Sequence, residues 1–103
     1  MKIQKTFDGR DLGLAASVLK DMANPRRLMV LCMLGAGEMS VGSMAEAVGL
    51  SPSALSQHLA KLRKDSLVAC RKESQTVYYR LASPAVADVI AALSLHFCGG
   101  RKK

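Results

Sequence analysis

The chain has 103 residues, half of them hydrophobic, which fits one globular domain and leaves little room for a second. Its net charge of +7 favours an anionic partner, although charge alone does not distinguish nucleic acid from an acidic membrane surface. No uninterrupted apolar run of about 18 residues occurs, so we expect no membrane span, and the N-terminal residues lead into no secretory signal. Three cysteines without such a signal indicate a reducing cytoplasm rather than a disulfide scaffold.

Residues 1–103 are predicted to form a single domain whose ends, residues 1–9 and 99–103, are frayed. Between these ends, a side chain that can cap a helix precedes proline at three places. The three pairs are Asn24-Pro25, Ser51-Pro52 and Ser83-Pro84. The cap oxygen accepts a bond from a free backbone N–H, and proline at the first helical position loses no bond and presets φ. Three helices are therefore predicted to begin at these prolines.

Five helices are predicted from apolar residues at helical spacing and from the residues that end each run. In chain order they cover residues 11–22, 25–34, 40–49, 52–64 and 84–98. The second helix carries Leu28, Leu31 and Cys32 on one face, and glycines follow its end. The fourth helix has a predicted buried stripe at positions i, i+4 and i+7, formed by Leu55, Leu59 and Leu62.

After Leu67 the apolar spacing changes from helical to alternating. Val77, Tyr79 and Leu81 alternate with Tyr78 and Arg80, which predicts a strand, and residues 68–71 are predicted to pair with it. Residues 72–75 form the expected polar tip of the hairpin. The predicted fold is therefore mainly α with a small β-hairpin, in the order α-α-α-α-β-β-α, which is a winged helix-turn-helix.

Residues 40–64 contain two short helices joined by a tight turn at Gly49-Leu50, the arrangement of a helix-turn-helix. The second of these helices directs small polar side chains outward, from Ser53, Ser56 and Gln57. Such side chains are short enough to let a helix enter the major groove, and they donate to and accept from base edges. Cations follow where phosphates would flank the groove. On the helix they are Lys61, Arg63 and Lys64, and on the hairpin they are Arg71, Lys72 and Arg80.

An amphipathic helix whose outer face is only solvated would explain this helix taken by itself. The turn glycine, the basic flank and the basic hairpin, in this order, instead favour double-stranded DNA as the partner. His58 lies beside two leucines of the stripe, which favours a partly buried, hydrogen-bonded histidine over a base contact. The last helix is apolar on nearly every face, which favours burial in a dimer over a central helix of a monomer.

Three stretches of the chain resemble the ArsR/SmtB family of bacterial winged-helix regulators. They read NPRRLMVLCML, SVGSMAEAVGLSPSALSQHLAKLRKDSLV and RKESQTVYYRL, and the resemblance covers about residues 14–98. It implies a homodimer, formed mainly by the first and last helices, that binds an inverted-repeat operator in a promoter and is usually released by an inducer. It also implies base and backbone contacts from Ser53, Ser56, Gln57 and Lys61.

Family members that sense metals use ligand sets that are incomplete in this chain. The thiol site on the third helix needs Cys-x-Cys, where this sequence reads Ser40-Val41-Gly42 and offers no soft ligand. The zinc site on the last helix needs Asp-x-His and a further histidine, whereas Asp88 is followed by Val89-Ile90 and His96 stands alone. We therefore expect no metal and no other cofactor, with a metal sensor that uses an unrecognised site as an alternative.

Cys32 on the second helix and Cys98 at the end of the last helix match a persulfide- and redox-responsive branch of the family, which carries one cysteine in each of these helices. That resemblance implies that a reactive sulfur species or an oxidant joins the two thiols and thereby releases DNA. Taken without the resemblance, two buried cysteines that act as small hydrophobic residues are the plainer interpretation. Cys70, on a predicted strand, is expected to take no part in this chemistry.

Arg26, Arg27 and His96 are the candidates for lowering the pKa of a thiol. No enzyme is expected, because the chain has no Cys-x-x-Cys near a βαβ unit, no Ser/His/Asp set and no phosphate loop. The remaining alternative is a winged-helix regulator, anti-silencer or DNA-architectural module with structural cysteines and no small-molecule inducer.

Overall fold

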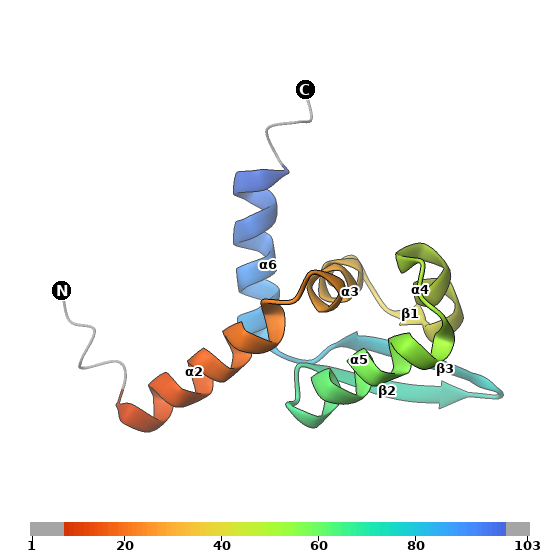
Figure 1. The fold of residues 1–103 in the computed structure, drawn as a ribbon, viewed down its shortest axis with the longest axis horizontal. Coiled ribbons are helices and arrows are strands. Elements are labelled where there is room, and N and C mark those ends of the chain that lie inside the picture. The colour runs from red at the N-terminus through yellow and green to blue at the C-terminus, as the bar shows by residue number, and fades with distance from the viewer. Residues whose placement is uncertain (1–7, 99–103) are drawn as a thin grey trace.

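The computed structural model describes residues 8–98, which form helices and strands in the order of a winged helix-turn-helix, as the sequence predicts (Figure 1). The helices are α2 (Gly9–Met22), α3 (Pro25–Gly35), α4 (Val41–Val48), α5 (Pro52–Lys64) and α6 (Pro84–Phe97). The strands are β1 (Met39–Ser40), β2 (Val68–Glu73) and β3 (Thr76–Leu81). The chain is therefore mainly helical with a small sheet.

The predicted caps are confirmed at the three helices that begin with proline. The caps are Asn24 for α3, Ser51 for α5 and Ser83 for α6, and each side-chain oxygen accepts from a backbone N–H of the first turn. Ser40 caps α4 in the same way, and Gly49 ends that helix with φ at 73°. Because only glycine adopts this left-handed conformation without a steric cost, Gly49 sets the tight turn between α4 and α5.

The N-terminal boundary of the domain differs from the prediction. Asp8 and Gly9, expected in a frayed tail, instead cap and begin α2. Asp8 Oδ1 accepts from the backbone N–H of Asp11 at 2.8 Å, and Asp11 Oδ2 accepts from the N–H of Asp8 at 3.4 Å. This reciprocal capping box satisfies two backbone donors at once, so the helix starts earlier than its apolar spacing indicates. The rest of the predicted tails, residues 1–7 and 99–103, lies outside the described residues.

The sheet has three strands, in the order β1-β3-β2, where the sequence predicts only the two-stranded hairpin. The additional strand β1 pairs antiparallel with β3, with Met39 opposite Tyr79 and Ser40 opposite Tyr78. Two residues are too few to show an alternating pattern, so this strand was missed. The hairpin itself is longer than predicted, since β2 runs to Glu73 and β3 starts at Thr76.

The core is built around α3, which packs against the other four helices and against β3. The predicted stripe of α5, Leu55, Leu59 and Leu62, is completely buried. By contrast, α2 and α6 extend away from this core, as Figure 1 shows. Several of their large apolar side chains are between 54% and 70% exposed, namely Leu12, Leu14, Leu19, Leu95 and Phe97. Among residues 8–98, no helix has the length and apolar character needed to cross a membrane.

Candidate nucleic-acid interface and cysteine pair

The recognition helix α5 has one face in the core and the other face in solvent. Its three buried leucines fix its orientation, and the small polar residues of the sequence prediction lie on the free face. The exposed residues of α5 are Pro52, Ser53, Ser56, Gln57, Ala60, Lys61, Arg63 and Lys64. His58 is half-buried beside the leucine stripe, in agreement with its predicted place at the edge of the core. The free face therefore presents hydroxyl and amide groups first and cations last.

Lys61 is tied to two carboxylates. Its Nζ lies 3.3 Å from Asp65 Oδ2 and 3.6 Å from Asp21 Oδ1. Asp21, near the end of α2, is only 3% exposed, and its Oδ2 has no hydrogen-bond partner among the described residues. Burial raises the pKa of Asp21, the neighbouring Asp65 raises it further, and Lys61 opposes both effects. Lys61 thus connects α5 to α2 in addition to facing the solvent.

The other cations of α5 and of the wing differ in whether they contact another group of the protein. Arg63 Nη1 donates to Cys70 Sγ at 2.9 Å, which joins α5 to β2. Lys64 and Lys72 are exposed and take part in no ion pair within residues 8–98. An exposed ammonium group outside any ion pair is well suited to contact a phosphate, and the phosphate role of these two lysines stays a prediction.

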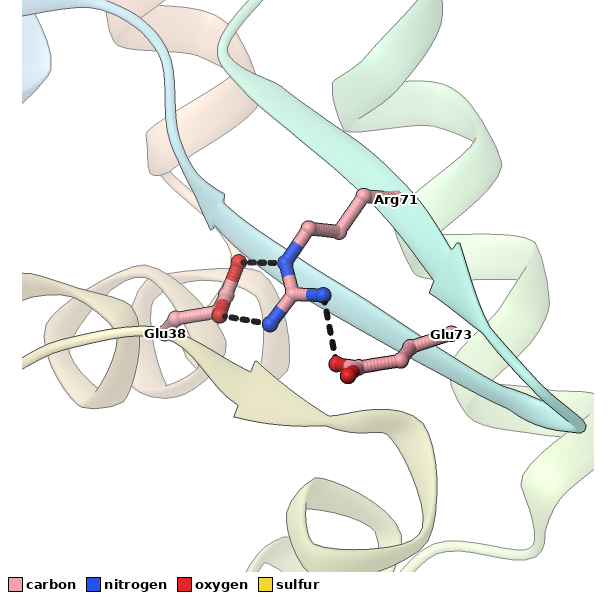
Figure 2. Close-up of polar contacts among 3 residues, drawn as sticks. All are labelled: Glu38, Arg71 and Glu73. Atoms are coloured by element: carbon pink, nitrogen blue, oxygen red, sulfur yellow. Dashed lines mark hydrogen bonds and ion pairs between the residues drawn. The ribbon is translucent and has the colours of Figure 1, made fainter.

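Arg71 is held by two carboxylates, as Figure 2 shows. Its Nε and Nη2 donate to the two carboxylate oxygens of Glu38 at 2.9 and 2.8 Å, and its Nη1 donates to Glu73 at 2.8 Å. Its guanidinium carbon also lies 4.6 Å from the centre of the Tyr78 ring. The hydrogen bonds from Arg71 lower the pKa of Glu38. This bidentate pair fastens the wing to the segment before β1, a contact that sequence spacing does not show.

A groove of about 540 Å³ with a mixed polar and apolar lining lies beside the recognition helix. Residues from the start of α4, from α5 and from the tip and second strand of the wing line it. They are Ser40, Val41, Gly42, Ser56, Gln75, Thr76, Val77 and Tyr79. The recognition helix, the first helix-turn-helix element and the wing therefore share one surface, and Ser56 is the predicted DNA contact that lies on it.

Cys32 and Cys98 line one cavity of about 400 Å³ between α3 and α6. Both thiols are free, and both residues are exposed in the protomer, so the interpretation of two buried cysteines is wrong for the single chain. Partial burial raises the pKa of Cys32, and the neighbouring Cys98 raises it further. The structure thus brings these two predicted residues together, whereas Cys70 lies on β2 and contacts Arg63 instead.

Of the three residues expected to lower the pKa of a thiol, the two arginines of α3 donate to other groups, and the role of His96 stays a prediction. Arg26 Nη1 donates to the carbonyl oxygen of Val48 at 3.0 Å, and Arg27 Nε donates to that of Asp21 at 2.8 Å. The pKa of Cys32 is raised rather than lowered, which corrects the expectation for this thiol. Within residues 8–98, no group of three or more His, Cys, Asp or Glu side chains gathers where it could hold a metal ion.

Comparison with known proteins identifies relatives along nearly the whole described chain. Residues 24–69 match the family described as "Bacterial regulatory protein, arsR family". Over 84 residues the chain is 52% identical to the nodulation protein NolR of Rhizobium meliloti, which covers 82% of this chain and 69% of NolR. Over 84 residues it is 54% identical to the transcriptional activator HlyU of Vibrio cholerae, which covers 82% of this chain and 78% of HlyU.

Solved structures agree with these relatives in fold. A structure of reduced HlyU from Vibrio cholerae has a TM-score of 0.85 at 48% identity and covers 92% of this chain and 98% of that one. A homodimeric winged helix-turn-helix DNA-binding domain from Mycobacterium bovis has a TM-score of 0.76 at 33% identity, covering 93% of this chain and 86% of that one. The chain therefore belongs to the bacterial ArsR family and is a DNA-binding transcriptional regulator with the winged helix-turn-helix fold.

Proposed function

We propose that this regulator binds an inverted-repeat operator as a homodimer and releases it when Cys32 and Cys98 become joined through sulfur. The observation that carries the proposal is that both thiols line one cavity between α3, which lies at the centre of the DNA-binding core, and α6, which lies largely outside it. A bond between these two helices would change the angle of α6 to the core.

The dimer is proposed to form through α2 and α6. Exposed leucines on α2 and the exposed Leu95 and Phe97 on α6 leave apolar surface in water, which a second copy of the chain would bury. The relative from Mycobacterium bovis is described as homodimeric. In such a dimer the angle of α6 sets the separation of the two recognition helices, and that separation must match the spacing of the operator half-sites.

On DNA, we assign the readout of bases to Ser53, Ser56 and Gln57, which lie on the free face of α5. Lys64 and Lys72 are assigned to phosphates because both are exposed and outside the ion pairs of the described chain. Lys61 and Arg71 are assigned to the same interface, where each would keep part of its bonding to the protein.

The sulfur chemistry needs one oxidising equivalent for each pair of thiols. With a persulfide R–S–SH, one thiol takes the terminal sulfur, R–SH leaves, and the second thiol displaces H₂S to form the disulfide. With a peroxide, one thiol becomes a sulfenic acid as the first water leaves, and the second thiol then displaces another water. In a reducing compartment both thiols stay free, so the reduced dimer is the DNA-bound form.

Operator binding by the reduced protein, followed by fluorescence anisotropy before and after persulfide treatment, tests the proposal. We expect the parent and Cys70→Ser to lose about a hundredfold in affinity, which corresponds to about 3 kcal/mol, and Cys32→Ser and Cys98→Ser to stay bound. Mass spectrometry should find Cys32 and Cys98 peptides joined through sulfur. Normal release by Cys32→Ser, or a bridge that involves only Cys70, would show that the proposed switch is wrong.

A further inference from the structure

A buried carboxylate joins the end of α2 to the recognition helix. The side chain of Asp21 is almost completely buried, and Lys61 Nζ lies 3.6 Å from its Oδ1. The other oxygen, Oδ2, is buried and has no hydrogen-bond partner within residues 8–98. An ionised carboxylate in such a place lacks most of the hydration that it has in water, so its charge depends strongly on the neighbouring ammonium group.

The other charged groups around Asp21 come from α5 and α3. Asp65, which caps the C-terminus of α5, can accept a hydrogen bond from Asp21 when Asp21 is protonated. Lys64, in the last turn of α5, acts on Asp65. Arg27 on α3 donates its Nε to the backbone carbonyl of Asp21 at 2.8 Å, not to the carboxylate. In the described part of the chain, the charges that act on the Asp21 carboxylate are therefore Lys61 and Asp65.

The carboxylate pair of Asp21 and Asp65 is suited to hold a single proton. Two neighbouring carboxylates resist ionising together, and the buried member loses more hydration when it ionises. Burial raises the pKa of Asp21, and its hydrogen bond to Asp65 raises it further. The same bond lowers the pKa of Asp65, and Lys61 lowers it further. The proton therefore belongs on Asp21, and Lys61 is the group that opposes it.

Lys61 holds its two carboxylate partners unequally. Its Nζ donates to Asp65 Oδ2 at 3.3 Å within one turn of α5, whereas its 3.6 Å contact with Asp21 is longer than a hydrogen bond. The side chain of Lys61 is half-exposed on the free face of α5. Its flexible chain can turn Nζ towards a phosphate and keep the contact with Asp65. The contact with Asp21 is therefore the one that Lys61 loses first.

We propose that Asp21 is a positioning residue that holds Lys61 in the free protein, and that Lys61 exchanges Asp21 for a phosphate when the operator binds, whereupon Asp21 takes up a proton from the solvent. This inference rests on the proposed function, because it assumes that Lys61 contacts DNA. Once its cation has left and phosphates are near, ionised Asp21 becomes still less favourable than the protonated form.

This exchange makes DNA binding depend on pH. Because the pKa of Asp21 is higher in the complex than in the free protein, the complex binds more protons and forms more tightly as pH falls. The gain in affinity is fully present below the pKa of Asp21 in the free protein, which already lies above the ordinary value of 3.8. It is lost as pH rises through the higher pKa of Asp21 in the complex.

Isothermal titration calorimetry counts these protons. The reduced dimer is titrated with a DNA duplex that carries the operator, at values from about pH 5 to about pH 7, in buffers of different ionisation enthalpy. The difference in heat between buffers gives the protons taken up. We expect the parent to take up about 0.5–1 proton per dimer more than Asp21→Asn, which corresponds to an affinity that rises about threefold to tenfold more per unit fall in pH. A purely structural role of Asp21 would change the affinity without changing the proton count.

Lys61→Gln and Lys64→Gln are the matched variants, since each removes one cation from α5 and each should weaken DNA binding. Lys61→Gln leaves Asp21 without its cation before DNA binds, so the additional uptake should disappear as in Asp21→Asn, whereas Lys64→Gln should keep it. His58 and His96 are present in every protein compared, so any protons that they exchange cancel in the differences.

Equal proton uptake by the parent and Asp21→Asn would overturn the inference while the operator is still bound. A loss of uptake in Lys64→Gln as large as that in Lys61→Gln would overturn it as well, because the effect would then belong to any cation of α5. If the reduced parent does not bind the operator duplex, the proposed function itself is wrong and the inference falls with it.

Discussion

At the scale of single residues, the charged side chains near the proposed DNA surface contact carboxylates of the protein as well as water. Arg71 uses three of its nitrogens on Glu38 and Glu73, and Lys61 lies near Asp21 and Asp65. Apart from Asp21, which is buried, the partners in these pairs are exposed or half-exposed, so each of the other pairs contributes modestly to stability. Their larger effect is positional, because they tie the wing to the segment before β1 and tie α5 to α2.

Glu38→Gln tests whether the Arg71–Glu38 pair positions the wing or whether Glu38 only competes with DNA phosphate for the guanidinium group of Arg71. If the bidentate pair positions the wing, the variant should bind the operator about threefold to tenfold more weakly, although it removes a negative charge near DNA. If Glu38 only competes with phosphate, the variant should bind more tightly. Anisotropy titrations decide between the two signs. Glu46→Gln, an equal change of charge at an exposed position of α4, is the control.

Asp21→Asn tests the buried carboxylate. A raised pKa means that the folded protein holds this proton more tightly than the unfolded chain, so ionisation of Asp21 lowers stability as pH rises above the ordinary value of 3.8. The free energy of unfolding of Asp21→Asn, minus that of the parent, should therefore increase from about pH 4 to pH 7. Urea unfolding over this range measures it. A decrease would mean that the attraction to Lys61 outweighs burial.

At the scale of elements, the proposed function divides the recognition helix into a half that reads bases and a half that contacts phosphates. Gln57→Ala should lower the discrimination against mutated operators by about 1–3 kcal/mol and leave binding to random DNA nearly unchanged. Lys64→Ala should weaken both kinds of binding and reduce the slope of log affinity against log salt by about 1 for each protomer. Equal losses on both DNAs for Gln57→Ala would contradict its assignment to a base contact.

The elements that were predictable from sequence are those whose signals are local. Ser51-Pro52 marks the start of α5, and the spacing of the leucines marks its buried face. Each of these signals comes from residues within one or two helical turns of each other. The pairing of β1 with β3 and the contact of Arg71 with Glu38 join residues far apart in the chain. No local pattern encodes such contacts, since they depend on where the packed helices place the ends of each segment.

The cysteine pair was predictable from sequence only in part. The resemblance to a branch of the family singled out Cys32 and Cys98, and the structure places them at one cavity. The uncharged lining and the direction of the Cys32 pKa shift depend on Leu93, Phe97 and their neighbours after packing. The sequence therefore predicted which residues meet, whereas the chemical environment in which they meet required the three-dimensional structure.

At the scale of the whole molecule, the exposed apolar face of α2 and α6 makes the assembly testable. Leu14→Glu and Leu95→Glu change side chains that are 63% and 70% exposed in the protomer, so neither should alter protomer folding much. In a dimer built through these helices, each variant would bury a charge without a partner and should become monomeric. We expect sedimentation equilibrium to show this and operator affinity to fall at least about tenfold, since a monomer holds one half-site.

Ala47→Glu, an exposed position on α4, controls for the added charge and should remain dimeric. A Leu14→Glu protein that stays dimeric would remove α2 from the proposed interface, and the same result for Leu95→Glu would remove α6. The two helices are thus tested independently.

The central helix α3 has two faces with different neighbours. Val30, Leu31 and Leu34 are buried in the core that supports the recognition helix, while Cys32 opens to the cavity beside α6. The thiol at which the proposed switch acts and the DNA-binding core are therefore separated by the thickness of one helix, about 10 Å. If the proposed switch operates, its chemistry and operator affinity share this helix, so a change that adapts one face of α3 to a new reagent is constrained by the packing of the other face.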